Sequence, residues 1–461
     1  MVVNLVPTLA YSERSRSRHP LRFLLRLLFV AALLSPDAVP AQAQTVTPTD
    51  RRQVPGQNND RAPQNADTAP VKADPNDGDT ENGIDDSYRA RGINLESFLL
   101  LPKFEADEKF NSNIYGETLA KGDFQTVLRP SFALHSRFPQ HALNVSGQLE
   151  DVEHIRFTQD NHLDGYIQTD GRYDLNRAAF INASFQYSGT HEDRGDNNDA
   201  QGRTPTPIES VGGTIGTTVQ DGRYSFGVSG TGTRLTYGNV SSSLGTPIAN
   251  DLRDRTEGTG TLRAGYELFP GYVAVAEGTA NTRQYDTTAD ASGFNRDSDG
   301  YVILTGVGLD ITSLLRGDFL AGYMQQFYQD PRFKPEGGPT IKVTLDWTPD
   351  RQTLIVPSLE RSINETTLAS ASSFIHNSVS VMARHELQRN ITLSGFFTYG
   401  YDEFPGTSQF SSTYQGQVRA AYALNRNLYL GTEVSYENKS TSLANRSFDR
   451  FILGLRLGTQ F

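Results

Sequence analysis

The chain has 461 residues, a formal net charge of −11, no cysteine and only 36% hydrophobic residues, yet it carries 20 tyrosines and 25 phenylalanines. The lack of cysteine excludes a disulfide framework, and the acidic balance argues against nucleic-acid binding. No long apolar run follows the first forty residues, which excludes a bundle of membrane-spanning helices. Low average hydrophobicity with many aromatic residues suits a membrane barrel, because half of its residues face water.

Residues 1–43 have the pattern of a secretory signal peptide. Five arginines surround or precede an eight-residue apolar stretch at 27–34, which is too short to span a bilayer, and residues 41–43 read Ala-Gln-Ala. We therefore expect the chain to be exported and this segment to be cleaved.

Residues 44–92 are rich in Pro, Asn, Gln and Asp and contain a single aromatic residue, Tyr88. Such a composition cannot bury a core, so we expect an acidic, disordered periplasmic linker whose role stays open. The run 74–86 has a weak likeness to a calcium loop, but its glycine offset does not fit an EF-hand. We accordingly expect no metal site and no cofactor.

From about residue 93 to residue 461 the sequence alternates with a period of two. This pattern predicts an all-β fold, an antiparallel transmembrane barrel of about eighteen strands, with sixteen as the alternative count. The end of the chain illustrates it, because every second residue apart from Thr459 is apolar and the residues between them, apart from Ile452, are small, polar or basic. The apolar set is Phe451, Leu453, Leu455, Leu457 and the terminal Phe461, and the other set includes Arg450, Gly454, Arg456 and Gly458.

The connections between the predicted strands alternate in length, as in an outer-membrane barrel with short periplasmic turns and long external loops. This predicts an even strand number, with Phe461 at the periplasmic rim and the last strand paired with the one that begins near Leu95. The short turns are expected at 138–140, 174–176, 220–222, 269–271, 348–350, 388–390 and 425–427, where Asn, Asp, Gly and Pro recur. The long loops are expected around 106–123, 152–162, 189–205, 237–253, 286–299, 329–339, 363–371, 403–411 and 439–447.

Four segments resemble a known family. They are FEADEKFNSNIY at 104–115, YMQQFYQD at 323–330, LDWTPD at 345–350 and LERSINETT at 359–367. Together they are similar to the "putative beta-barrel porin 2" family of bacterial outer-membrane proteins, over roughly residues 92–461. The resemblance implies a barrel inserted by the barrel-assembly machinery and, for some members, a link to surface-polysaccharide genes. It brings no catalytic residues.

Charged residues on the predicted inner face are the candidate functional residues, because the lipid face tolerates charge poorly. We assign a pore-lining role to Arg384, Arg419, Glu433, Arg450 and Arg456, which would select solutes by charge. The alternative is a set of ion pairs across the lumen that hold the wall rigid. We assign Phe461, Leu457 and Leu455 to the outer-membrane assembly signal.

The acidic runs at 191–199 and 286–299 admit two interpretations. They could bind divalent ions that bridge lipopolysaccharide, or they could be plain solvated loops, which such stretches more often are. We favour the solvated loops.

These patterns predict a porin-like channel in the outer membrane of a Gram-negative bacterium, for hydrophilic solutes, with surface-polysaccharide export as a more specific use. The expected partners are outer-membrane lipids and lipopolysaccharide, the barrel-assembly machinery and polysaccharide export components. The alternative is a non-conducting structural or surface-binding barrel. An enzyme is disfavoured, because the eight histidines are scattered and no Gly-x-Ser-x-Gly, His-Glu-x-x-His or phosphate loop occurs.

Overall fold

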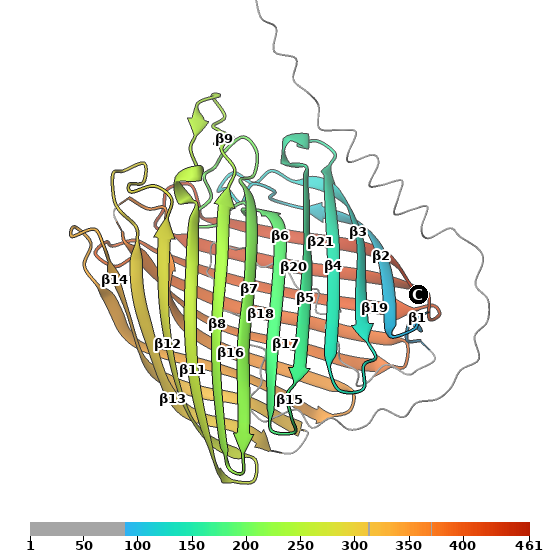
Figure 1. Ribbon diagram of the computed structural model, residues 1–461. Helices are drawn as coiled ribbons and strands as arrows, with labels where there is room; N and C mark the ends of the chain where they lie inside the picture. The colour runs from blue at the N-terminus through green and yellow to red at the C-terminus, as the bar shows by residue number, and fades with distance from the viewer. Residues whose placement is uncertain (1–87, 312–313, 370) are drawn as a thin grey trace, which may run out of the picture. The chain divides into compact units, whose positions relative to one another are not determined.

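The computed structural model describes residues 88–311, 314–369 and 371–461, and the predicted signal peptide and nearly all of the linker lie outside these residues. Eighteen antiparallel strands form the wall of a closed barrel (Figure 1). They are β2 (Phe98–Asn111), β3 (Asp123–Ser136), β4 (Ala142–His154), β5 (His162–Asp174), β6 (Ala179–His191), β7 (Pro207–Asp221), β8 (Tyr224–Tyr237), β11 (Arg255–Phe269), β12 (Tyr272–Tyr285), β13 (Ser298–Ile311), β14 (Leu315–Tyr328), β15 (Glu336–Asp350), β16 (Thr353–Glu365), β17 (Ser373–Gln388), β18 (Ile391–Glu403), β19 (Phe410–Ala423), β20 (Leu428–Thr441) and β21 (Phe448–Gln460).

The barrel closes between its first and last wall strands. β2 pairs with β21 from Lys103 opposite Gln460 to Asn111 opposite Ile452, so the blue and red ends of the sheet meet (Figure 1). The short strand β1 (Ile93–Leu95) pairs with the start of β2, beyond the end of β21. Each wall strand therefore has two neighbours, and no backbone edge is left unpaired in lipid. The prediction of eighteen strands is confirmed, and the alternative of sixteen is wrong.

Alternation gives each strand one apolar face and one polar face. On β21, Leu453, Leu455 and Leu457 are exposed at 46%, 66% and 50%, while Arg450, Gly454 and Gly458 in the alternate set are buried. Exposed leucines on a barrel wall are stable only against lipid, so this face is the outer one and the alternate residues face the lumen. The three leucines and Phe461, which is also exposed, lie where the sequence predicted them. Whether they act in assembly stays a prediction.

Short turns and long loops fall at opposite ends of the strands, as expected. The turns include residues 222–223, 270–271 and 351–352, and the longest loop, 238–254, holds the β9 (Val240–Ser241) and β10 (Pro247–Ile248) hairpin and the 3₁₀ turn η2 (Asp251–Arg253). Another 3₁₀ turn, η1 (Thr158–Asp160), lies between β4 and β5. Among the described residues, no helix is both long and apolar enough to cross a membrane.

The first long loop begins later than predicted. We expected it near residue 106, but β2 continues to Asn111. The acidic and basic residues at 105, 107 and 109 look like loop residues in sequence. They remain in the strand because they face inward, where oppositely charged side chains of neighbouring strands neutralise them.

Candidate functional site

The loop between β6 and β7, residues 192–206, leaves the barrel wall and crosses the lumen; we call it the crossing loop. Several of its polar side chains are almost completely buried, among them Asn198 at 2%, Asp199 at 4% and Thr206 at 1% exposure. Asn and Asp side chains reach such burial only when partners satisfy their hydrogen bonds. The expectation of a plain solvated loop is therefore wrong for this segment.

Neighbouring loops hold the base of the crossing loop. Arg253 of η2 forms an ion pair with Glu192 at 2.8 Å, and the Asn250 amide donates to the Thr206 hydroxyl at 3.1 Å. The Arg194 guanidinium donates to the Asp160 carboxylate at 2.7 and 2.9 Å. These contacts fix the point at which the chain turns inward.

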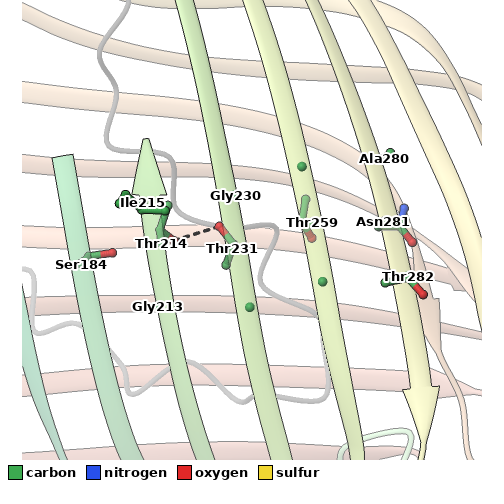
Figure 2. Close-up of a pocket in the computed structure, with 13 residues that line it drawn as sticks. Ser184, Gly213, Thr214, Ile215, Gly230, Thr231, Thr259, Ala280, Asn281 and Thr282 are labelled. Atoms are coloured by element: carbon green, nitrogen blue, oxygen red, sulfur yellow. Dashed lines mark hydrogen bonds between the residues drawn. The ribbon is translucent and has the colours of Figure 1, made fainter. Parts of the chain in front are cut away.

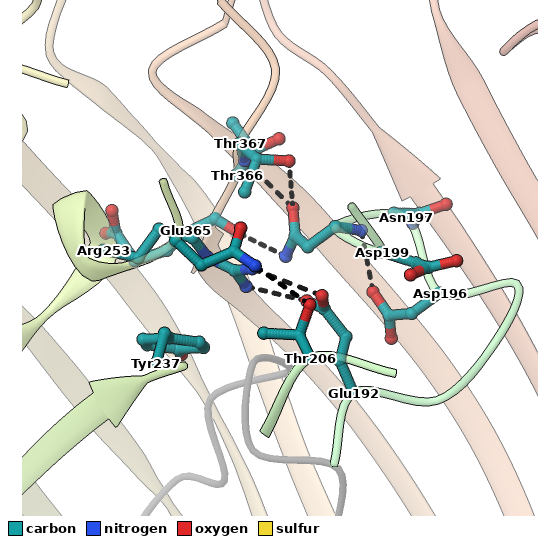
Figure 3. A network of polar contacts seen from close by, with 12 residues as sticks. Glu192, Asp196, Asn197, Asp199, Thr206, Tyr237, Arg253, Glu365, Thr366 and Thr367 are labelled. Carbon is teal, nitrogen blue, oxygen red and sulfur yellow. Dashed lines mark hydrogen bonds and ion pairs between the residues drawn. The ribbon is translucent and has the colours of Figure 1, made fainter. Parts of the chain in front are cut away.

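The tip of the crossing loop reaches β16 and the loop that follows it, which are not neighbours of β6 or β7 in the sheet. Figure 3 shows the centre of this contact around Glu365 and Thr367. The amide of Asn198 donates to the Glu365 carbonyl at 3.3 Å, and its oxygen accepts from the Thr367 backbone at 2.9 Å. On β18, the Asp402 carboxylate accepts from Asn197 at 2.6 Å. The loop is thus anchored on both sides of the lumen.

Basic residues near the chain's end bind the backbone of the crossing loop. Arg446 donates to the carbonyls of Asp196, Asn197 and Asp199 at 2.8 to 3.0 Å. Lys439 donates to the Gly195 carbonyl, and Arg450 donates to the Arg194 carbonyl. Because these cations bind carbonyl oxygens, they add contacts to the backbone of the loop beside the ion pairs that its acidic side chains form.

Gly195 shows how closely the crossing loop packs. Its φ is +89°, and a Cβ atom built there would lie 2.5 Å from the Phe448 ring of β21. Glycine alone adopts this backbone conformation without strain and leaves room for the ring. The Arg194-Gly195-Asp196 run, which could be taken for a surface adhesion tripeptide, is therefore a packing element.

Burial raises the pKa of two groups in the crossing loop and the loop beside it. Burial and the neighbouring Asp160 carboxylate raise the pKa of Tyr115, in the β2–β3 loop, to about 12, so its hydroxyl stays neutral. Burial also raises the pKa of Asp199, despite the Arg194 guanidinium 4.0 Å away.

The five predicted pore-lining residues all lie on the inner face, but each is close to an opposite charge. Arg456 contacts Asp107 at 2.8 Å, Arg419 contacts Glu433 at 3.2 Å, and Arg384 lies 3.5 Å from Glu386. Arg450 contacts Glu437 on β20 at 3.2 Å and Asp193 of the crossing loop at 3.7 Å. Their side chains are 9–14% exposed. A pore-lining role for them stays a prediction.

Most of these pairs join neighbouring strands and do not span the lumen. Three of the five residues, Arg419, Glu433 and Arg456, belong to a network that we call the charged wall, formed by the inner faces of β2, β3 and β19–β21. Tyr429 joins it by donating to Glu105, and at 7% exposure it offers little surface on which a sugar could stack. The members are Glu105, Asp107, Lys109, Arg129, Arg419, Tyr429, Glu433 and Arg456.

The inner positions of β7 and β8 have a different chemistry, and we call them the hydroxyl wall. Val211, Ile215 and Val219 are exposed on the outer face of β7, which places the residues between them inside. The inner set carries no charge: Ser210, Gly212, Thr214, Gly216 and Thr218 on β7, and Ser225, Gly227, Ser229, Thr231 and Thr233 on β8.

Small side chains leave space around the hydroxyl wall. A hollow of about 750 Å³ is lined by residues of β6, β7, β8, β11 and β12, including Ser184, Thr231 and Thr259. Figure 2 shows these residues on adjacent strands, with the Thr214 and Thr231 hydroxyls hydrogen-bonded at 2.9 Å. The residues that line this hollow offer hydroxyl groups but no ionic ones.

Sequence reasoning found the inner-face charges but missed the crossing loop. The run at 191–199 is acidic and rich in Asn and Gly, which is the composition of solvated loops as well. The partners that bury it, Lys439, Arg446 and Arg450, lie about 250 positions further along the chain. No local signal connects them.

The chain matches the family described as "Putative beta-barrel porin 2" over residues 86–461. No curated protein matches the chain. Similar solved structures include the siderophore receptor PiuA from Acinetobacter baumannii, with 9% identity, a TM-score of 0.44 and coverage of 78% of this chain and 82% of that one. Another is OpdO from Pseudomonas aeruginosa, with 11% identity, a TM-score of 0.38 and coverage of 79% and 97%. Given the match over most of its length and its closed barrel, the chain belongs to the Putative beta-barrel porin 2 family.

Proposed function

We propose that the protein is an outer-membrane channel for hydrophilic, uncharged solutes, narrowed by the crossing loop. The observation that carries this proposal is the anchoring of residues 192–206 across the lumen, from Glu192 at the base to Asn198 at the tip. An eighteen-stranded barrel is wide enough for an aqueous passage. An inward loop reduces the passage to the size of small solutes.

The hydroxyl wall supports the choice of uncharged solutes. Thr214, Thr231 and Ser229 offer hydrogen-bonding groups without the fixed charge that would favour ions of one sign. The charged wall adds little selectivity by charge, because its acids and bases neutralise one another at short distance. Sugars and other polyhydroxy compounds fit this lining, so surface-polysaccharide export is the more specific form of the proposal.

A second candidate is a non-conducting barrel. The low exposure of the crossing loop and its many contacts favour it, because a loop held this firmly could seal the lumen. The two candidates differ in conductance and in the effect of removing the loop.

The test is planar-bilayer recording of the full-length protein and of a variant in which a short Gly-Ser linker replaces residues 194–204. We expect channel steps from the full-length protein and a conductance several times larger from the variant. The control removes residues 243–245 at the tip of the β9–β10 hairpin, where Leu244 is 92% exposed, and should leave the conductance unchanged.

Silence from both proteins would contradict the channel proposal. A silent full-length protein with a conducting variant would favour the sealed barrel. Liposome-swelling rates with neutral sugars and with charged sugars of equal size then test the solute class. Faster entry of a charged sugar would contradict the role given to the hydroxyl wall.

A further inference from the structure

Two histidines and one aspartate lie together where β5 and β6 reach the long-loop end of the barrel. They are His162, Asp164 and His191, and each offers one ligand atom such that the three atoms lie within 4.8 Å of one another. The rings of His162 and His191 are 3.7 Å apart between centroids. The Asp164 carboxylate accepts from Nδ1 of His191 at 2.7 Å. All three side chains are partly buried.

The local backbone explains how these residues come together. The regular pairing of β5 with β6 ends at Gly165 and Gly189. The side chains beyond this pair can therefore approach one another more closely than side chains on paired strands do. His162 is the first residue of β5, and His191 is the last residue of β6. Asp164 lies on the inner side of β5, opposite Glu150 of β4.

Nearby groups satisfy some of the hydrogen-bonding atoms of the cluster, but they do not explain why two histidines lie together here. Nδ1 of His162 contacts the Asp160 carbonyl at 2.7 Å, which fixes that ring and leaves Nε2 for another partner. The Glu150 carboxylate, opposite Asp164 on β4, forms its ion pair with Arg129 at 2.6 Å. An ion pair between Asp164 and His191 would form without His162, so it does not explain why the His162 ring lies against the His191 ring.

A third histidine borders the cluster. The ring of His154, on β4, lies 6.2 Å from that of His162. It is 6% exposed, and its Nδ1 has no hydrogen-bond partner among the described residues. A buried imidazole nitrogen without a partner is unfavourable unless a ligand or a water satisfies it.

We propose that His162, Asp164 and His191 bind a divalent transition-metal cation of the zinc class. Two imidazoles and one carboxylate, with a fourth position left for water, are a donor set that zinc, nickel and copper accept. Calcium and magnesium prefer sites made of oxygen alone, so the two histidines discriminate against them. The contact of His162 with the Asp160 carbonyl can orient that ring, as outer-shell partners do in metal sites, and the hydrogen bond from His191 to Asp164 holds two of the proposed ligands side by side.

The proposed site lies next to the start of the crossing loop. His191 directly precedes Glu192, the first residue of the crossing loop. A cation held there would fix β5 to β6 at the point where the loop turns into the lumen. The inference does not depend on conduction, since binding is measured on the protein in detergent.

The experiment is isothermal titration of the full-length protein, without a polyhistidine tag, with zinc chloride in the presence of excess calcium and magnesium. We expect one zinc ion per chain. His162→Ala and His191→Ala should each weaken zinc binding by about tenfold or more, since each removes one ligand. The matched control is His376→Ala. His376 forms an ion pair with Asp402 at 2.5 Å but does not belong to the proposed site, so its loss should leave the zinc affinity unchanged.

The absorption spectrum of the wild-type protein with cobalt is a second readout, and it does not depend on the folding of any variant. Wild-type protein should give the strong visible bands of a four-coordinate cobalt site, and His162→Ala with an unchanged heat-modified gel mobility should lose them. Zinc affinity that is unchanged in His162→Ala and His191→Ala would overturn the proposal. So would a wild-type cobalt spectrum with only the weak bands of the hydrated ion.

Discussion

The charged wall and the hydroxyl wall belong to one barrel and share one backbone pattern, but they differ in almost every other respect. In the charged wall, Asp107 is 2% exposed and contacts Arg129, Lys109 and Arg456. In the hydroxyl wall, Thr214 contacts Thr231 through a single hydroxyl pair and has no charged neighbour in that set.

The difference follows from the surroundings of the two faces of a strand, which are lipid on the outside and water or other side chains on the inside. The outer face is mostly apolar, because lipid offers few partners for a polar group. The inner face meets water or other side chains, so its chemistry is free to vary from one strand to the next. We infer that the charged wall contributes mainly to stability and the hydroxyl wall mainly to passage.

The largest effect is expected from Asp107→Ala. This change leaves three basic side chains without their shared buried partner and should lower the free energy of unfolding by about 3–5 kcal/mol. Urea unfolding followed by gel mobility measures it. The control is Glu108→Ala on the exposed face of β2, and equal losses from both variants would contradict a special role for the charged wall.

Thr231→Arg tests the hydroxyl wall. A cation at this uncharged position should roughly halve the conductance and turn the channel toward anions, because the side chain both narrows the passage and repels cations. Bilayer recording in a salt gradient measures both effects. Thr231→Val, which changes neither size nor charge appreciably, should conduct as the wild type does, and an unchanged Thr231→Arg channel would place the passage elsewhere.

A smaller change in selectivity is expected from the double substitution Arg384→Glu and Arg419→Glu. The reversal potential should move toward cation preference, by less than Thr231→Arg moves it in the other direction. The reason is that Glu386 and Glu433 already neutralise most of the field of the two arginines. Lysine at both positions is the charge-conserving control. No movement at all would assign the arginines to stability alone.

The smallest effect is expected from Thr214→Val. It removes one side of the Thr214–Thr231 hydroxyl pair and should cost about 1 kcal/mol or less, since water in the lumen can replace the lost partner. The same unfolding measurement applies. A loss as large as that of Asp107→Ala would remove the distinction between the two walls.

Much of the fold was predictable because its signals are local. Alternation of side chains with a period of two identified strands such as β20 and β21, and Asn, Asp, Gly and Pro marked the short turns. The exceptions were charged strand ends. Lys109 on β2 looks like a loop residue until its partner Glu433, 324 positions away in sequence, is brought within 3.5 Å.

By itself the sequence determined the strand pattern, the outward leucines of β21 and the inward position of Arg419, Arg450 and Arg456, because each depends only on the alternation of neighbouring residues. The tertiary structure decided the rest. It placed residues 192–206 across the lumen, chose the ionic partners of inner charges such as Arg450, and brought His162 beside His191. The first two arrangements depend on contacts between distant parts of the chain, which meet when the barrel closes between β2 and β21. The third depends on how the ends of β5 and β6 leave their regular pairing.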